Sequence, residues 1–226
     1  MRIKKLHIKS KNFSEQLRFF REVLELPIQK ISETEVEITV GYSKLILEKS
    51  SEFTPYHIAF HIPPQKIEES VNWLKKRVEI QSFKDDEIID FSSWNAKSTY
   101  FYDKDFNILE FISREKLFDE IRNQVQHDKF DSNQILGIAE IGLATDEVQS
   151  SFNFLADNFQ LKKYSGDFEK FCAIGDDEGL IITINKNKKD WFPTNDKAFT
   201  SPFQLQFEQA KNTHQFSFKN NNLTIC

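Results

Sequence analysis

The stretch TPYHIAFHIPP, residues 54–64, holds two of the five histidines of the chain. Imidazole side chains bind divalent metals or transfer protons near neutral pH. Side chains alternate along a strand, so His57 and His61 point to one face while Ile58 and Phe60 point to the other. Four residues of strand span about 13 Å, which is too far for both imidazoles to bind one ion. The segment therefore offers one metal ligand at most, and simple packing of two imidazoles is the alternative.

A carboxylate stands in a second apolar run, NILEF. Glu110 lies between Leu109 and Phe111 and shares its own face with Ile108 and Ile112. Burying a carboxylate in such surroundings is expensive unless it is paired or bound to a metal. We therefore interpret Glu110 as a metal ligand rather than as a surface glutamate.

Three further side chains could take part in chemistry. His7 is flanked by Leu6 and Ile8 and so points away from the face on which they pack. It is a candidate ligand, with an exposed strand histidine as the alternative. Tyr100 and Tyr102 share one face of their strand, where their hydroxyls could reach a substrate oxygen, although ordinary strand packing is an equally good interpretation.

These residues belong to a repeated order of elements. Hydrophobic periodicity predicts a strand around His7, then a helix over residues 14–26, then a hairpin of strands over 35–40 and 43–49. The same order follows again: a strand at 56–62, a helix at 67–78, and strands at 88–91, 97–102 and 107–112. A repeat of this length is a signal of the fold itself.

A third copy begins near Leu136, where IAEIGLATDEVQSSF aligns with KLHIKSKNFSEQLRF. This alignment puts Glu140 at the position of His7, and we expect Glu140 to lie at the surface, with a position facing a pocket as the alternative. The tail from Asp190 predicts short strands without a helix. We therefore expect two complete units in residues 1–115, a helical linker at 116–134, and a degenerate second half at 135–226 without a second metal site.

Composition limits the classes of protein to consider. The net charge of the 226-residue chain is −5 and no basic block occurs, which argues against a nucleic-acid partner. No apolar run is long enough to cross a membrane. The two cysteines, Cys172 and Cys226, suggest no disulfide framework, so a reducing, cytoplasmic setting is expected.

Taken together, the strand with His7, the helix ending in RFFREVLEL, HIAF and YFYDKDFNILEF resemble the vicinal oxygen chelate superfamily, which includes glyoxalase I, extradiol dioxygenases and bleomycin-resistance proteins. The turn at 103–107 departs from the family's usual Asp-Pro-Asp-Gly-Asn. The resemblance implies an α+β fold of paired βαβββ modules whose mixed sheets form a cup.

The resemblance also implies one divalent metal inside the cup. By matching motifs, its ligands would be His7, His57 and Glu110, and the metal Fe, Mn, Zn, Ni or Co. His61, Tyr100 and Tyr102 would be the nearby candidates for proton donation or substrate contact.

Two functions follow from this resemblance. The first is a metal-dependent enzyme that acts on a small molecule with two neighbouring oxygens, by ring-cleaving dioxygenation or by isomerase or lyase chemistry. The second is a metal-free binding protein of the bleomycin-resistance type. Either could work as a monomer with two halves or as a homodimer, because module pairing occurs both within and between chains of this superfamily.

Overall fold

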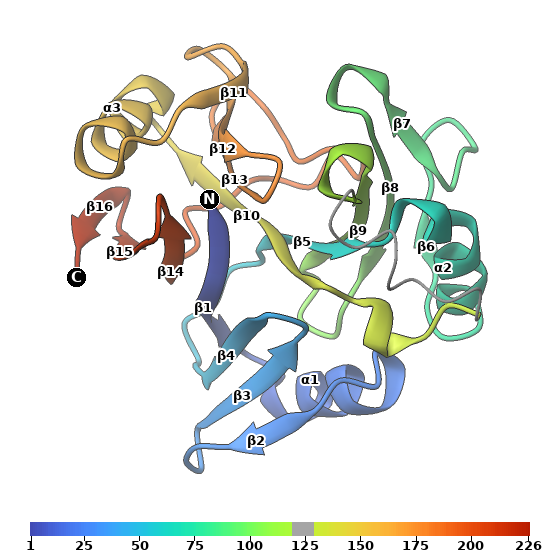
Figure 1. The fold of residues 1–226 in the computed structure, drawn as a ribbon. Helices are drawn as coiled ribbons and strands as arrows, with labels where there is room; N and C mark the ends of the chain where they lie inside the picture. Colours follow the sequence, from blue (N-terminus) through green and yellow to red (C-terminus); the bar gives the residue numbers. More distant parts are fainter. Residues whose placement is uncertain (119–128) are drawn as a thin grey trace.

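The computed structural model describes residues 1–118 and 129–226, and its strands form two mixed β-sheets (Figure 1). The expected α+β class is confirmed. The seven-stranded sheet, here called sheet A, consists of β1 (Arg2–Ser10), β2 (Ile28–Lys30), β3 (Glu35–Val40), β4 (Ser43–Lys49), β14 (Phe203–Gln209), β15 (Asn212–Lys219) and β16 (Asn222–Ile225).

The nine-stranded sheet, here called sheet B, lies beside it. It consists of β5 (His57–Ile62), β6 (Ile80–Gln81), β7 (Ile89–Phe91), β8 (Ala96–Tyr102), β9 (Ile108–Arg114), β10 (Gly137–Thr145), β11 (Lys163–Gly166), β12 (Phe171–Asp176) and β13 (Gly179–Asn185). The sequence-based strands agree with these bounds to within about two residues, because each strand has its own apolar alternation.

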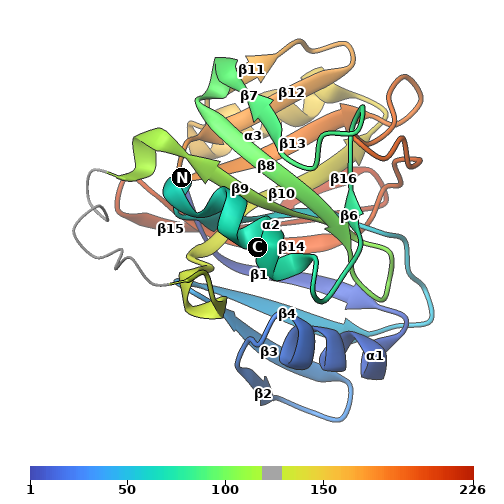
Figure 2. The same ribbon diagram turned by 90° about the vertical axis from the view of Figure 1, so that its right-hand side faces the viewer.

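Three α-helices accompany the sheets in the described residues: α1 (Phe13–Arg18), α2 (Ile67–Leu74) and α3 (Val148–Phe159). α1 continues as a π-helix over Phe19–Val23 and so ends before the expected residue 26. Figure 2 shows α1 beside the strands of sheet A and α2 in front of β9. α3 contacts β12 and β13. Each helix therefore covers the sheet to which its own unit belongs.

The pairing of the units differs from the expected division at 1–115 and 135–226. In sheet A, β1 of the first unit pairs antiparallel with β14 of the C-terminal strands. In sheet B, β5 of the second unit pairs antiparallel with β10 of the third. The first unit thus pairs with the fourth, and the second with the third. Both pairs form within one chain, so no second subunit is needed to complete either sheet.

Burial distinguishes the two sheets. β1 and β14 alternate between buried and partly exposed residues, whereas every residue of β5, β9, β10 and β13 is buried. Alternation indicates one solvated face, and complete burial indicates that both faces are covered. One face of sheet B contributes to the main core shared with sheet A. The other face has a smaller apolar cluster that includes Trp191 and Ala198 from the connection between β13 and β14.

The expected helical linker at 116–134 lies largely outside the described residues. The parts that are described form short 3₁₀ turns at Glu115–Phe118 and Ser132–Gln134. Within residues 1–118 and 129–226, no helix has the length and apolar character that crossing a membrane requires.

Candidate metal site and aromatic cavity

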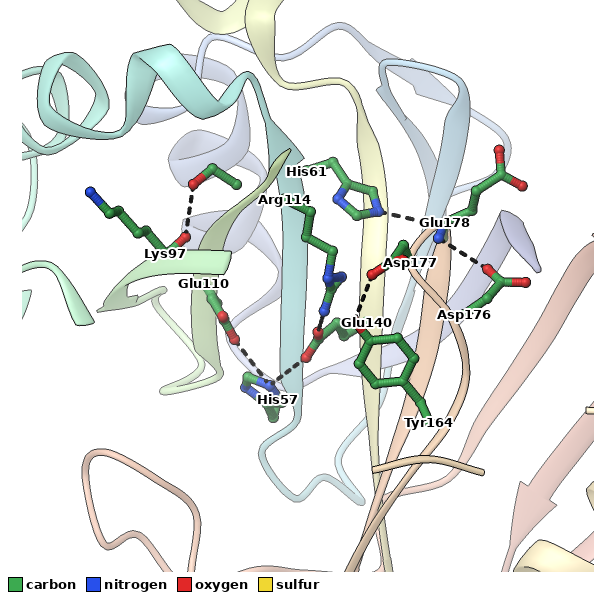
Figure 3. A network of polar contacts seen from close by, with 11 residues as sticks. His57, His61, Lys97, Glu110, Arg114, Glu140, Tyr164, Asp176, Asp177 and Glu178 are labelled. Carbon is green, nitrogen blue, oxygen red and sulfur yellow. Dashed lines mark hydrogen bonds and ion pairs between the residues drawn. The ribbon is translucent and has the colours of Figure 1, made fainter. Parts of the chain in front are cut away.

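Three side chains of sheet B converge at its centre: His57 from β5, Glu110 from β9 and Glu140 from β10 (Figure 3). One ligand atom from each lies within 4.8 Å of the others, and all three residues are buried. His57 Nε2 lies 3.4 Å from Glu110 Oε2 and 3.8 Å from Glu140 Oε2. One imidazole nitrogen and two carboxylate oxygens form a donor set that suits a divalent ion.

The backbone places His57 and Glu110 together through regular pairing. β5 and β9 are parallel neighbours, with Ala59 opposite Glu110 and His57 opposite Ile108. Residues two apart on a strand share a face, so His57, Ala59 and Glu110 point to the same side of the sheet. The small side chain of Ala59 leaves the room in which the imidazole and the carboxylate meet.

Glu140 reaches this site through a β-bulge. Ile138 pairs with Phe60 and Ile141 pairs with Ile58, both on the core face, but the register shifts between Ile138 and Glu140 so that Glu140 lies opposite Ala59. A bulge inserts one extra residue and redirects the side chains around it. Without it, strict alternation from Ile138 would turn Glu140 toward the core. The expected surface position of Glu140 is therefore wrong, since this residue is only 3% exposed.

Arg114, the last residue of β9, holds Glu140 in place. One of its terminal nitrogens donates a very short hydrogen bond to Glu140 Oε1, and Arg114 is itself only 1% exposed. In Figure 3 its side chain extends from the level of His61 down to Glu140. The other oxygen of Glu140 faces His57. Arg114 thus leaves one oxygen of Glu140 free for a ligand.

The charges of this cluster explain why a cation fits it. Burial raises the pKa of Glu110, and the negative charge of Glu140 raises it further. Burial alone would lower the pKa of His57, but its contact with Glu140 and the charges of Glu110 and Glu140 outweigh burial and raise it. Arg114 compensates one carboxylate, and a proton on His57 or on Glu110 compensates the other. A divalent ion could replace that proton and compensate the charge more fully.

His7 does not join this group, which corrects its expected role as a third ligand. It lies on β1 in sheet A, where its Nε2 is 3.2 Å from Glu48 Oε2 on β4. The pair repeats the arrangement of His57 and Glu110. In each case the glutamate lies on the parallel neighbouring strand, opposite the residue two positions after the histidine: Glu48 opposite Lys9, and Glu110 opposite Ala59. His7 belongs to the other sheet because the first unit pairs with the C-terminal strands and not with the second unit.

The His7 pair lines a cavity of about 300 Å³ on sheet A, together with Lys9, Gln204 and Lys219 among others. No second carboxylate completes this pair among the residues that line the cavity.

The register of the strands also corrects the alignment of the third unit. β1 and β10 are both nine residues long, and both have a register shift after their second residue, at Ile3 and at Ile138. Matching these shifts puts Gly142 at the position of His7, and Glu140 two residues earlier. A Cβ on Gly142 would lie only 2.6 Å from the indole of Trp191. Trp191 therefore occupies the space that a histidine would fill in this unit.

His61 lies on the same face as His57 but makes different contacts. Its Nε2 lies 3.3 Å from the main-chain oxygen of Glu178, and it is 2% exposed. Because a carbonyl only accepts, Nε2 carries the hydrogen. Burial and the nearby Arg114 charge lower the pKa of His61 to about 3. His61 does not line the aromatic cavity described below, so the structure does not support its expected role as a substrate contact.

The two tyrosines have different surroundings. Tyr100 lies next to the triad, with its ring stacked 6.4 Å from that of His57. Burial raises the pKa of its hydroxyl well above the usual value, with the charge of Glu110 adding to the effect. Tyr100 therefore stays protonated and can donate a hydrogen bond. Tyr102 instead donates a 2.5 Å hydrogen bond to Asp196, and it anchors the connection before β14 rather than lining the cavity.

An aromatic cavity of about 380 Å³ opens on the triad. Its walls carry six aromatic side chains: Phe91, Trp94, Tyr100, Phe171, Trp191 and Phe192. The rings of Trp191 and His57 lie 5.2 Å apart, so the wall begins at the triad itself. A mostly apolar cavity with a few convergent polar groups is typical of a small-molecule site.

Sequence reasoning missed Glu140 and Arg114 as members of the site. The cost of burying a carboxylate, which identified Glu110, applies equally to Glu140 in the apolar run IAEIGLA. Arg114 stands at the end of the same apolar strand and shares a face with Glu110 and Ile112. This position in the sequence could have identified Arg114 as a charged partner in the site. For Trp94 and Trp191 the sequence allows either a place in a substrate pocket or core or lid packing, and both residues line the cavity.

Comparison with known proteins supports the fold. No family model matches the sequence, and no curated protein matches it. Among solved structures, a candidate dioxygenase from Bacillus subtilis matches with a TM-score of 0.59 at 14% identity, over 81% of this chain and 63% of that one. This likeness supports the expected α+β fold and shows nothing beyond the fold.

Two shorter proteins match about half of the chain. Lactoylglutathione lyase from Agrobacterium tumefaciens matches 52% of this chain and 96% of its own, with a TM-score of 0.43 at 15% identity. A glyoxalase/bleomycin resistance protein/dioxygenase from Nocardioides matches 50% of this chain and 83% of its own, with a TM-score of 0.41 at 17% identity.

Proposed function

We propose that this protein is a metal-dependent enzyme of the glyoxalase and dioxygenase type, which binds one divalent ion through His57, Glu110 and Glu140. The observation that carries the proposal is the convergence of one imidazole and two carboxylates in a buried site that opens into an aromatic cavity. Three protein ligands leave coordination positions open, which a structural site does not.

The ligand set also bears on the identity of the ion. The sequence led us to expect two histidines and one carboxylate, whereas the candidate site has one histidine and two carboxylates. Oxygen ligands favour harder ions, so among Fe, Mn, Zn, Ni and Co we expect Mn(II) or Fe(II) to fit best. A bound ion would act as a Lewis acid toward two neighbouring oxygens of a small molecule.

The side chains around the triad have separate roles in this proposal. Arg114 fixes the orientation of Glu140 and compensates its charge, Tyr100 donates a hydrogen bond to a substrate oxygen, and Trp191 excludes water from the triad. Whether the reaction is ring cleavage by dioxygen or an isomerase or lyase reaction depends on the substrate.

A second candidate function is supported by the charge balance of the same cluster. With His57 protonated, the charges of Arg114, His57, Glu110 and Glu140 sum to zero. The cluster can therefore close on itself without a metal, as a binding protein of the bleomycin-resistance type would require. The aromatic cavity would then be the binding site.

Metal analysis separates these two functions. The purified protein, dialysed against Mn(II) or Fe(II) without oxygen, should retain one equivalent of metal by elemental analysis. His57→Ala and Glu110→Gln should abolish stoichiometric binding. His7→Ala and Glu48→Gln are matched controls, because they remove the equivalent pair from sheet A, and they should bind as wild type does. If the triad variants retained as much metal as the sheet A controls, the proposed metal site would be contradicted.

A wild-type protein without stoichiometric metal would instead favour the binding protein. In that case small aromatic ligands should still raise the melting temperature in the presence of a chelator.

A further inference from the structure

The charged groups in the aromatic cavity lie on different elements. Glu110 and Glu140 belong to the triad on β9 and β10, whereas the one lysine among the lining residues, Lys189, follows β13. Between these charged groups the lining consists mainly of aromatic and aliphatic side chains. The cavity therefore combines flat apolar walls with one cation that does not belong to the triad.

Lys189 differs from the lysines next to it. Lys186 pairs with Asp146 at 3.2 Å, and Lys188 pairs with Glu169 at 3.4 Å. Within residues 1–118 and 129–226, Lys189 forms no ion pair. Its Nζ lies instead 6.0 Å from the centre of the Phe171 ring. Phe171 is itself a wall of the cavity and packs against Trp94 at 6.2 Å.

We propose that Lys189 determines ligand specificity by binding the carboxylate of a planar aromatic acid, whose ring lies between the aromatic walls and whose other end reaches the triad. The part that concerns the triad rests on the proposed function. The part that concerns Lys189 rests only on the cavity.

Three physical arguments support an aromatic anion. Rings of the wall stack or make edge contacts with a flat ligand, which favours a ring over an aliphatic chain. An ammonium group beside apolar walls is already incompletely hydrated. It therefore gives up little hydration when it pairs with an anion. The cavity volume of about 380 Å³ is near the lower end of the range for small-molecule sites, which limits the ligand to one or two rings.

A matched pair of probes tests this inference. 3,4-Dihydroxybenzoate and catechol differ only in the carboxylate, so calorimetric titration of both measures what the carboxylate contributes. Wild type should bind the acid about tenfold or more tightly than catechol, as a charge-assisted contact implies. Lys189→Met should abolish this preference, whereas Lys189→Arg should keep most of it. Lys188→Met is the control, because it removes a paired lysine from the same segment.

The outcomes for Lys189 and for the metal are distinguishable. Each titration is repeated with Mn(II) and with a chelator, and in Glu110→Gln. A preference for the acid that persists with chelator and depends on Lys189 supports this inference even where the metal proposal fails. An equal preference in wild type and Lys189→Met would overturn it, and so would the absence of binding of either probe to wild type.

Discussion

Arg114 and Glu140 form an ion pair that is almost completely withdrawn from solvent, with exposed fractions of 1% and 3%. The two residues come from neighbouring units of the chain, one at the end of β9 and the other at the bulge of β10. The pair therefore fixes one wall of the candidate metal site across a boundary between units.

Removing Arg114 should destabilise the protein, because Glu140 would remain as an uncompensated buried charge. Breaking one partner of a buried pair costs about 3–5 kcal/mol. We expect a loss of this size for Arg114→Met in urea unfolding with a chelator present. The double variant Arg114→Met/Glu140→Gln should recover much of the lost stability, because it also removes the uncompensated charge of Glu140. A loss below about 1 kcal/mol in the single variant would mean that the pair is effectively solvated.

Gly142 should tolerate no side chain, because Trp191 and His57 occupy the space around it. A Cβ at this position would lie 2.6 Å from Trp191 and 3.1 Å from His57 Cβ. Overpacking of this kind costs about 1–3 kcal/mol. We expect Gly142→Ala to lower stability by that amount in chemical unfolding and to shift the tryptophan emission spectrum.

The partner variant provides the control for this prediction. With Trp191→Leu in the background, Gly142→Ala should cost less, because the ring that it displaces is gone. Additive losses in the double variant would show that the two positions do not interact.

His61 should make stability sensitive to acid. In the folded protein its pKa is lowered to about 3, whereas an unperturbed histidine titrates near 6.5. Between these values the unfolded chain binds one more proton than the folded chain, so stability falls as the pH decreases from 6.5 toward 3. The slope from one group is about 1.4 kcal/mol per pH unit.

His61→Gln should remove this part of the pH dependence, because glutamine keeps a donor for the Glu178 carbonyl but does not titrate. The difference in unfolding free energy between wild type and His61→Gln, measured at several pH values, gives the contribution of His61 to the pH dependence of stability. A difference that stays constant with pH would mean that folding does not change the pKa of His61.

The amino-acid sequence by itself determined most of the longer strands, the starts of α1 and α2, and the repeat, but it gave no signal for the short strands β2, β6 and β11. Each strand carries its own alternation, so EVEITV and GLIITIN fall at Glu35–Val40 and Gly179–Asn185, as their pattern predicts. Alternation also predicted that His57 and His61 share a face of β5. The burial argument for Glu110 used only its apolar neighbours, and Glu110 is 2% exposed.

Only the tertiary structure decided which residues meet His57. Alternation gives the face of a side chain but not the sheet to which its strand belongs, and that choice depends on pairing between distant segments. β1 pairs with β14, so His7 meets Glu48 on another sheet. β5 pairs with β10, and a one-residue bulge turns Glu140 toward His57. Because such a bulge depends on long-range register rather than on local pattern, the meeting of Glu140 with His57 could be recognised only once the sheets were assembled.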